Sequence, residues 1–226
     1  LNDRAERNLG ERLNTREAFV QLFSLLGEGN LNAGMDFLFT ERKDAVVDQA
    51  MAKAAGDMSG LVLAVVPLDT VKTNYSGDPL DAEDSAILRK QLWHPIIKKA
   101  GKIPIAATFL MPNKELAKRA RLLGHIGVEP DSDGVYRKTT LLYRWEDGYM
   151  PAFSLALAAA NLGIDPSRVV IDAGNEIALP LQDGRTIRVP VDETGSVWIP
   201  FPSDWNSGWR RIALDKLANA DLSDDE

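Results

Sequence analysis

The chain has 226 residues, of which 45% are hydrophobic and 26% are charged, and its formal net charge at pH 7 is −7. A chain of this length buries about 70% of its unfolded surface without help from disulfides or metals, and its acidic balance argues against nucleic acid as a partner. The absence of cysteine excludes a disulfide scaffold, a Cys-bound zinc site and thiol chemistry.

No apolar run reaches the roughly 18 residues that a membrane-spanning helix requires, and the chain does not open on a signal peptide. It begins at Leu1 without an initiator methionine. We therefore expect it to be a piece of a longer protein.

Helices and strands alternate in the first third of the chain. Apolar residues recur at helical spacing in two segments and form short uninterrupted runs in two others. The predicted elements are a helix over 15–26, a strand over 33–39, a helix over 44–55 and a strand over 61–66. This alternation predicts a crossover unit in a parallel sheet.

The middle of the chain continues the alternation with longer connections. A polar loop over 68–79 precedes a helix over 81–93, which Pro95 is expected to kink or restart. A buried strand over 103–111 and a helix over 113–123 come next.

A hairpin and a buried helix are predicted after residue 124. Strands over 125–128 and 135–145 flank an acidic turn at Asp131–Gly134, where Asp and Gly tolerate the positive φ of a tight connection. Pro151 suits the first turn of the helix that follows, which we expect to run to Leu162.

The last quarter of the chain changes to the pattern of a β-meander. Four short strands are predicted over 169–171, 176–181, 186–190 and 196–201, separated by turns that contain glycine. A final helix over 212–218 and a disordered acidic tail over 221–226 complete the chain.

These elements predict an α/β fold. A mostly parallel or mixed central sheet is flanked by helices, and antiparallel hairpins are added in the C-terminal half. We expect a single domain over 1–220.

The sequence lacks the common catalytic and phosphate-binding motifs. There is no G-x-S-x-G elbow and no G-x-x-x-x-G-K-[ST] loop. The two histidines, His94 and His125, lie on different predicted elements without other metal ligands nearby, so a structural role is expected for each. We predict no cofactor and no metal.

Asp36 is the most informative single residue, because it interrupts the apolar run over 33–39. A buried carboxylate is costly unless it is paired or hydrogen-bonded, and the carboxyl end of a parallel strand is where open α/β sheets bind ligands. Two interpretations stay open. Asp36 forms a polar ligand-binding pocket with Asp3, Arg16 and Glu41, or it serves the fold by capping the next segment or pairing with Arg16.

Two further features have structural and functional interpretations. Asp131-x-Asp133-Gly134 is similar to the opening of a calcium loop, but the remaining ligands are missing, so a turn is expected. Arg137 is a candidate anion contact, with surface ion pairing as its alternative. Trp205 and Trp209 fill a core or mark a surface that docks a partner.

Several motifs resemble the type-two CHASE domain, a family of extracellular sensor modules associated with cyclases and histidine kinases. The resemblance is carried by Leu123-Gly124-His125, by the run from Pro130 to Arg137, by Leu141-Leu142-Tyr143 and by the run from Tyr149 to Ala156. In the N-terminal half, the family pattern is matched by Asp3, Leu9-Gly10, Arg16, the run from Asp36 to Phe39, Glu41 and the run from Val62 to Val66.

The resemblance implies a bacterial membrane receptor. The chain would be its extracytoplasmic, periplasmic or extracellular sensor domain, held between transmembrane helices in an inner-membrane receptor dimer. A cytoplasmic cyclase or kinase would provide the output, and a small molecule or a protein would be the ligand. No catalytic residue is implied.

Two alternatives come from other classes of protein. A metal-dependent hydrolase or phosphatase-like enzyme would use Asp36 with Asp3 and a divalent cation. A module without a small-molecule ligand would serve only to dimerise or to dock a partner.

Overall fold

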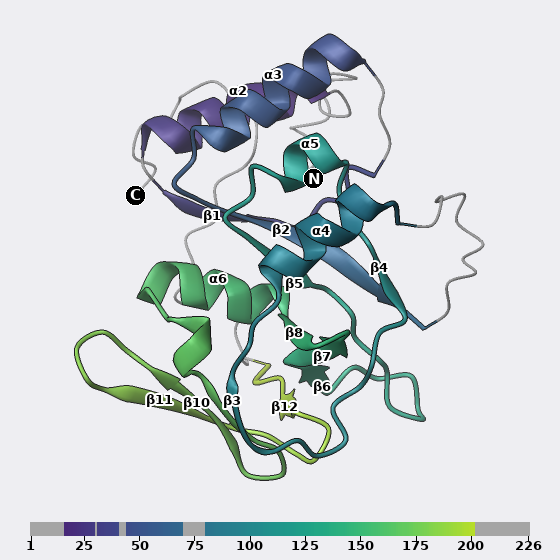
Figure 1. Cartoon of the computed structure of the whole chain (residues 1–226), viewed down its shortest axis with the longest axis vertical. Coiled ribbons are helices and arrows are strands. Elements are labelled where there is room, and N and C mark those ends of the chain that lie inside the picture. The colour runs from purple at the N-terminus through teal and green to yellow at the C-terminus, as the bar shows by residue number, and fades with distance from the viewer. Residues whose placement is uncertain (1–15, 30, 41–43, 70–79, 202–226) are drawn as a thin grey trace.

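The computed structural model describes residues 16–29, 31–40, 44–69 and 80–201 (Figure 1).

The first sheet is mixed and is built around one long strand. β2 (Gly60–Leu68) pairs in parallel with β1 (Asn32–Met35) and with β5 (Leu122–His125). Beyond the end of β1, β2 pairs in antiparallel with β4 (Thr108–Leu110). The parallel pairing predicted from the first third of the chain is therefore confirmed.

Helices cover both faces of this sheet, as Figure 1 shows. Successive residues of β2 point to opposite faces. Leu61, Leu63 and Val65 belong to the core under the helices of one face, and Val62 packs on the other face against α6 (Phe153–Leu162). The helices of the first face are α2 (Arg16–Glu28), α3 (Ala45–Gly56), α4 (Ala82–Gln91) and α5 (Lys114–Ala117).

The second sheet contains three of the four strands of the predicted β-meander and one added strand, whereas the fourth meander strand, predicted over 196–201, pairs elsewhere. β9 (Val170–Asp172), β10 (Glu176–Pro180) and β11 (Thr186–Pro190) are antiparallel neighbours. Gly174 and Gly184 stand at positive φ, +87° and +86°, in the two connecting turns, as a tight turn requires. A 3-10 turn, η2 (Pro166–Arg168), leads into β9.

Two pairs of strands complete the fold. β12 (Ser196–Trp198) pairs with β6 (Lys138–Thr140), and β7 (Leu142–Trp145) pairs with β8 (Gly148–Pro151), both in antiparallel. The predicted α/β class with antiparallel additions in the C-terminal half is confirmed. A single domain over 1–220 stays a prediction, because 202–226 lie outside the described residues, as does the predicted helix over 212–218.

Two predicted helical segments are strands in the structure. No helix restarts at Pro95, because β3 (Ile96–Lys99) follows and pairs in parallel with β9. The helix predicted over 113–123 is only α5, since the Arg121 N–H donates to the Leu61 carbonyl oxygen over 2.9 Å and draws the chain into the sheet as β5. In both places a long-range partner strand outweighs local helical spacing.

The predicted hairpin after residue 124 is also wrong in part. The acidic turn forms, with Gly134 at φ +79°, but the strands on its two sides do not pair with each other. The segment predicted as one strand over 135–145 divides into β6 and β7, which belong to different sheets. Pro151 ends β8, and α6 begins at Phe153.

α6 lies between the two cores of the domain. Leu155 and Ala159 pack into the core under the second sheet, and Ala156 and Ala160 pack on Val62 of the first. The approach to the first sheet is close at Gly124, where a Cβ would lie 2.5 Å from the Phe153 Cα and 2.9 Å from its nitrogen. Only glycine leaves room for the helix backbone there.

A methyl group at Gly124 should therefore lift α6 from the sheet. We expect Gly124→Ala to lower the free energy of unfolding by about 3 kcal/mol, measured by urea denaturation, because overpacking against backbone cannot be relieved by a side-chain rotation. Gly27→Ala is the matched control. A Cβ at Gly27 meets neighbours at ordinary distances of 3.6 and 3.7 Å, so this change should be neutral or stabilise by up to about 1 kcal/mol. Equal urea midpoints for Gly124→Ala and the wild type would contradict the close contact.

Candidate functional site

Arg16 is held inside the protein by an acidic residue of the neighbouring helix. Its guanidinium forms a hydrogen-bonded ion pair with the Asp48 carboxylate, and the two residues are 8% and 7% exposed. The pair joins the first turn of α2 to α3. Asp48 is not among the site residues predicted from the sequence. It stands on the α3 face with Met51, Ala52 and Ala55 at helical spacing, and a carboxylate on that otherwise apolar face is the signal that could have identified it.

Asp36 lies where the sequence places it along the chain, but it is not buried. β1 ends at Met35, so Asp36 follows the carboxyl end of a parallel strand. Its side chain is exposed, so the expectation of a buried carboxylate is wrong. The reason is that the strand is shorter than predicted, and the chain leaves the sheet before Asp36. The remaining two residues of the predicted site, Asp3 and Glu41, lie outside the described residues.

Aromatic rings surround the segment that follows Asp36. The Phe19 ring of α2 makes edge contacts with the rings of Phe37 and Phe39, with centroids 5.0 and 4.9 Å apart. Phe39 is buried, whereas Phe37 is 46% exposed. The structure therefore brings the first helix, which carries Arg16, against the segment that carries Asp36, although Arg16 pairs with Asp48.

The two aspartates should differ sharply in their contribution to stability. We expect Asp48→Ala to lower the free energy of unfolding by about 3 kcal/mol, because it removes a carboxylate that neutralises a buried guanidinium. Asp36→Ala should change it by less than about 0.5 kcal/mol, as is usual for an exposed side chain. Urea denaturation of both variants measures the contrast, and a larger loss from Asp36→Ala would restore the buried-carboxylate interpretation.

A second group of polar side chains gathers beyond the ends of β2 and β5. Val65 is the register partner of His125, and the Ile126 N–H donates to the Val65 carbonyl oxygen over 2.9 Å. Two residues further on, a Cβ at Gly127 would lie 2.4 Å from the Pro67 Cγ and 3.4 Å from the Tyr143 Cε2. The segment after β5 thus continues beside the end of β2, and the two segments lead to two exposed acids, Asp69 and Glu129.

Tyr143 lies between these acids and the interior. Burial raises the pKa of its phenol first, and the negative charges of Glu129 and Asp69 raise it further. Its ring meets the His125 ring edge-on, with centroids 4.7 Å apart and planes at 81°. Tyr143, Asp69 and Glu129 were not singled out from the sequence. An acid after each of two parallel strands is the signal that could have found the last two.

His125 is a buried ionisable group. It is 2% exposed, and neither ring nitrogen has a hydrogen-bond partner among the described protein atoms. Burial lowers its pKa to about 3, because the charged imidazolium is poorly solvated there. The expected structural role fits this burial, but His125 ends β5 instead of opening a strand.

The stability of the domain should therefore depend on pH through His125. In the unfolded protein the imidazole has its ordinary pKa of 6.5 and is protonated below that pH, whereas in the folded protein it stays neutral. The free energy of unfolding therefore falls as pH decreases from 6.5 toward 3. This group alone should cost about 2 kcal/mol between pH 7 and pH 5. Urea midpoints of His125→Gln should lack that share of the pH dependence, whereas His94→Gln, which changes an exposed histidine, should retain it. Identical pH profiles for His125→Gln and the wild type would contradict the assignment.

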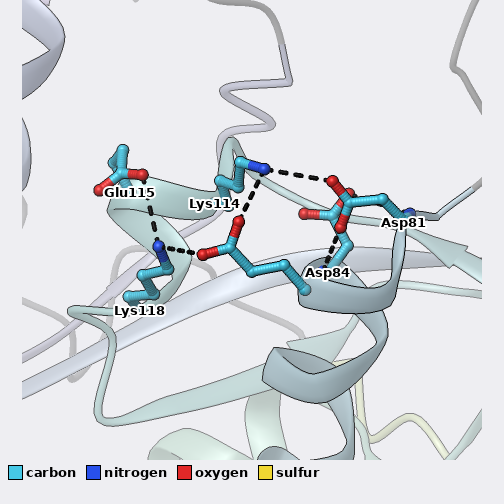
Figure 2. A network of polar contacts seen from close by, with 6 residues as sticks. Asp81, Asp84, Lys114, Glu115 and Lys118 are labelled. Atoms are coloured by element: carbon cyan, nitrogen blue, oxygen red, sulfur yellow. Dashed lines mark hydrogen bonds and ion pairs between the residues drawn. The ribbon is translucent and has the colours of Figure 1, made fainter.

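An ionic network fixes α4 against α5 on the same side of the sheet. Figure 2 shows Lys114 of α5 and Lys118, which directly follows this helix, pointing toward acids at the start of α4. The Lys114 Nζ lies 3.1 Å from Asp81 and 2.8 Å from Glu83, and the Lys118 Nζ lies 2.6 Å from Glu83. The hydrogen bonds to Glu83 and Asp81 raise the pKa of Lys114. Partly exposed pairs of this kind contribute modestly to stability, and they set the position of α4.

The other end of α4 is attached to the β7–β8 hairpin. The Arg89 guanidinium donates to both carboxylate oxygens of Glu146, over 2.6 and 2.8 Å. Glu146 stands in the hairpin turn at φ +49°, a conformation that non-glycine residues seldom adopt. α4 therefore connects α5 to the hairpin that carries Tyr143.

The structure shows which of the two predicted roles Arg137 has. Arg137 donates to Asp131 and Asp133 of the acidic turn over 2.9 and 2.8 Å, so its cationic group is engaged in the surface pairing expected as the alternative to an anion contact.

Within the described ranges, no group of three or more His, Asp or Glu residues could hold a metal ion. No helix in that part of the chain is long and apolar enough to cross a bilayer.

The fold and these sites define an α/β domain with polar groups at the carboxyl end of its central sheet. The family model of the CHASE2 domain matches residues 3–225, nearly the whole chain, so the chain belongs to the CHASE2 family. This is a family of extracellular sensor domains found in signalling receptors. Searches of curated proteins and of solved structures find no match. The resemblance seen in the sequence is confirmed.

Proposed function

We propose that this chain is the extracytoplasmic sensory domain of a bacterial transmembrane receptor. The observation that carries the proposal is the match to the CHASE2 domain over residues 3–225. In the proposed receptor, the domain lies in the periplasm or outside the cell, between transmembrane helices and as part of a dimer. A cytoplasmic cyclase or kinase reads its state.

The sensing event that we propose is binding at the carboxyl end of the first sheet. Asp36 is exposed there, directly after β1, in the position where open α/β sheets bind ligands. The proposed ligand-binding set is Asp3, Arg16, Asp36 and Glu41. Asp36 would contact the ligand, and Arg16, buried against Asp48, would fix the helix that borders the site.

A ligand acts on a receptor by binding one conformation more tightly than another. The Asp36 segment is suited to report binding, because its aromatic rings contact α2. A small molecule or a protein that binds Asp36 would thereby change how α2 packs. The difference in affinity between the two arrangements would set the signal.

A ligand of this site should raise the melting temperature of the domain. We expect at least one member of a panel of metabolites, inorganic anions and divalent cations to do so, because a ligand at 100 times its dissociation constant adds about 2.7 kcal/mol to stability. The shift should disappear in Asp36→Ala, measured by differential scanning fluorimetry. Asp57→Ala is the matched control, since Asp57 is an exposed carboxylate that precedes β2 at the opposite end of the sheet.

The outcomes separate the alternatives. A shift that persists in Asp36→Ala would move the ligand away from this end of β1. A panel without any effect would favour a module that docks a protein partner, for which the exposed Phe37 is available.

A further inference from the structure

The His125–Tyr143 contact is not used by the proposed ligand site, and its chemistry is unusual for a core. His125 is an ionisable side chain with both polar atoms buried and unpartnered in the described part of the chain. A neutral imidazole is tolerated in such a place, whereas an imidazolium is not unless a counter-charge or water reaches it. Therefore His125 either stays neutral in this structure, or its protonation changes the structure.

The elements that pack around His125 offer no counter-charge in contact with it. Val65 of β2 is the register partner of His125, and the buried residues of α4 and β8 on this face, Ile87, Leu88 and Met150, belong to the same apolar core as Val65. Of the four charged side chains of α4, Glu83 pairs with Lys114, Arg89 pairs with Glu146, Asp84 takes part in the capping box and Lys90 is exposed. β7 presents Tyr143, whose ring covers the imidazole.

Negative charge is present just beyond Tyr143. Asp69 follows β2, and Glu129 follows β5 by four residues. Both lie close enough to Tyr143 to raise the pKa of its hydroxyl. Burial lowers the pKa of His125, and the ring that His125 contacts is that of Tyr143, the residue that the two carboxylates influence.

We propose that the His125–Tyr143 contact is a proton-operated latch, in which protonation of His125 moves Tyr143 aside and opens the end of β5, so that the imidazolium reaches water and the carboxylates of Asp69 and Glu129. The latch deepens the proposed sensory function, on which it rests for its biological meaning. External acidity is then a stimulus of the domain, and α4, which is joined to the Tyr143 hairpin through Arg89 and Glu146, receives the movement.

The size of the response follows from proton linkage. With a pKa of about 3 in the closed state and the ordinary value of 6.5 once the imidazole is solvated, the ratio of open to closed molecules rises about 25-fold between pH 7 and pH 5, and the nearby carboxylates would only increase this factor. The absolute population depends on the cost of opening at neutral pH. The fold-change does not, and it is the quantity to measure.

Native-state hydrogen exchange tests the latch on the chain itself. The Ile126 amide, which donates to the Val65 carbonyl oxygen at the open end of β5, reports opening. Its protection, corrected for intrinsic rates, should fall about 25-fold from pH 7 to pH 5 and should be nearly independent of low urea concentrations, as local openings are. The Val191 amide, which donates to the Asn175 carbonyl oxygen in the second sheet, is the comparison that does not adjoin His125. If Ile126 exchanges only with the urea dependence of the most protected amides, His125 is uncovered by global unfolding alone and the latch is overturned.

Variants assign the response to the imidazole. His125→Gln should abolish the pH dependence at Ile126, and His94→Gln should retain it. Persistence of the effect in His125→Gln would overturn the proposal. Should that variant not fold, the His125 ring is titrated by NMR in the wild type, where its apparent pKa should fall between 3 and 6.5 together with a shift of the Tyr143 ring. A ring that stays neutral until the whole domain unfolds would refute the latch.

These results are independent of the search for a ligand at Asp36. Melting experiments without any ligand effect would remove the proposed binding site and leave the latch intact. If the Ile126 amide lost no more protection at pH 5 than the Val191 amide, the latch would be removed and the binding site left intact.

Discussion

The close approach of α6 to the first sheet is the constraint on which the rest of the structure depends. Gly124 has no side chain, so the backbone of Phe153 can lie where a Cβ would stand, and Gly34 of β1 leaves the matching space for the Phe153 ring. α6 then reaches Val62 with one face and the core under the second sheet with the other. One helix thus packs into two cores, and the strand that makes room for it ends at His125, where the polar groups gather.

Charge is distributed in this domain according to depth. The buried charges of Arg16 and Asp48 neutralise each other and join two helices. Three exposed acids, Asp36, Asp69 and Glu129, stand beyond the ends of strands, and His125 of β5 is kept neutral by its burial. A sensor needs an element with two arrangements of similar free energy. In the proposed latch, His125 and Tyr143 would provide such an element, because the two protonation states of the histidine favour different surroundings.

Much of the fold and part of the site could be predicted from the sequence. β2 was evident because an uninterrupted apolar run has one good interpretation, and β9 to β11 were evident because glycine turns fix short strands between them. β3, β5 and the start of α6 were missed, since their conformation depends on partners far along the chain: β9, β2 and β8. Asp36 was placed correctly near a strand end and wrongly in the interior, because β1 ends at Met35, four residues before the predicted end at residue 39.

The sequence by itself determined the class of fold, the family, and the residue types available at the end of the sheet. Periodicity, turn chemistry and local motifs carry that information, because they act between residues close together in the chain. Only the tertiary structure decided that Arg16 pairs with Asp48, that Tyr143 contacts His125, and that Asp69 and Glu129 lie near Tyr143. Burial and ion pairing act between residues that are distant in sequence, so they exist only once the sheet has assembled.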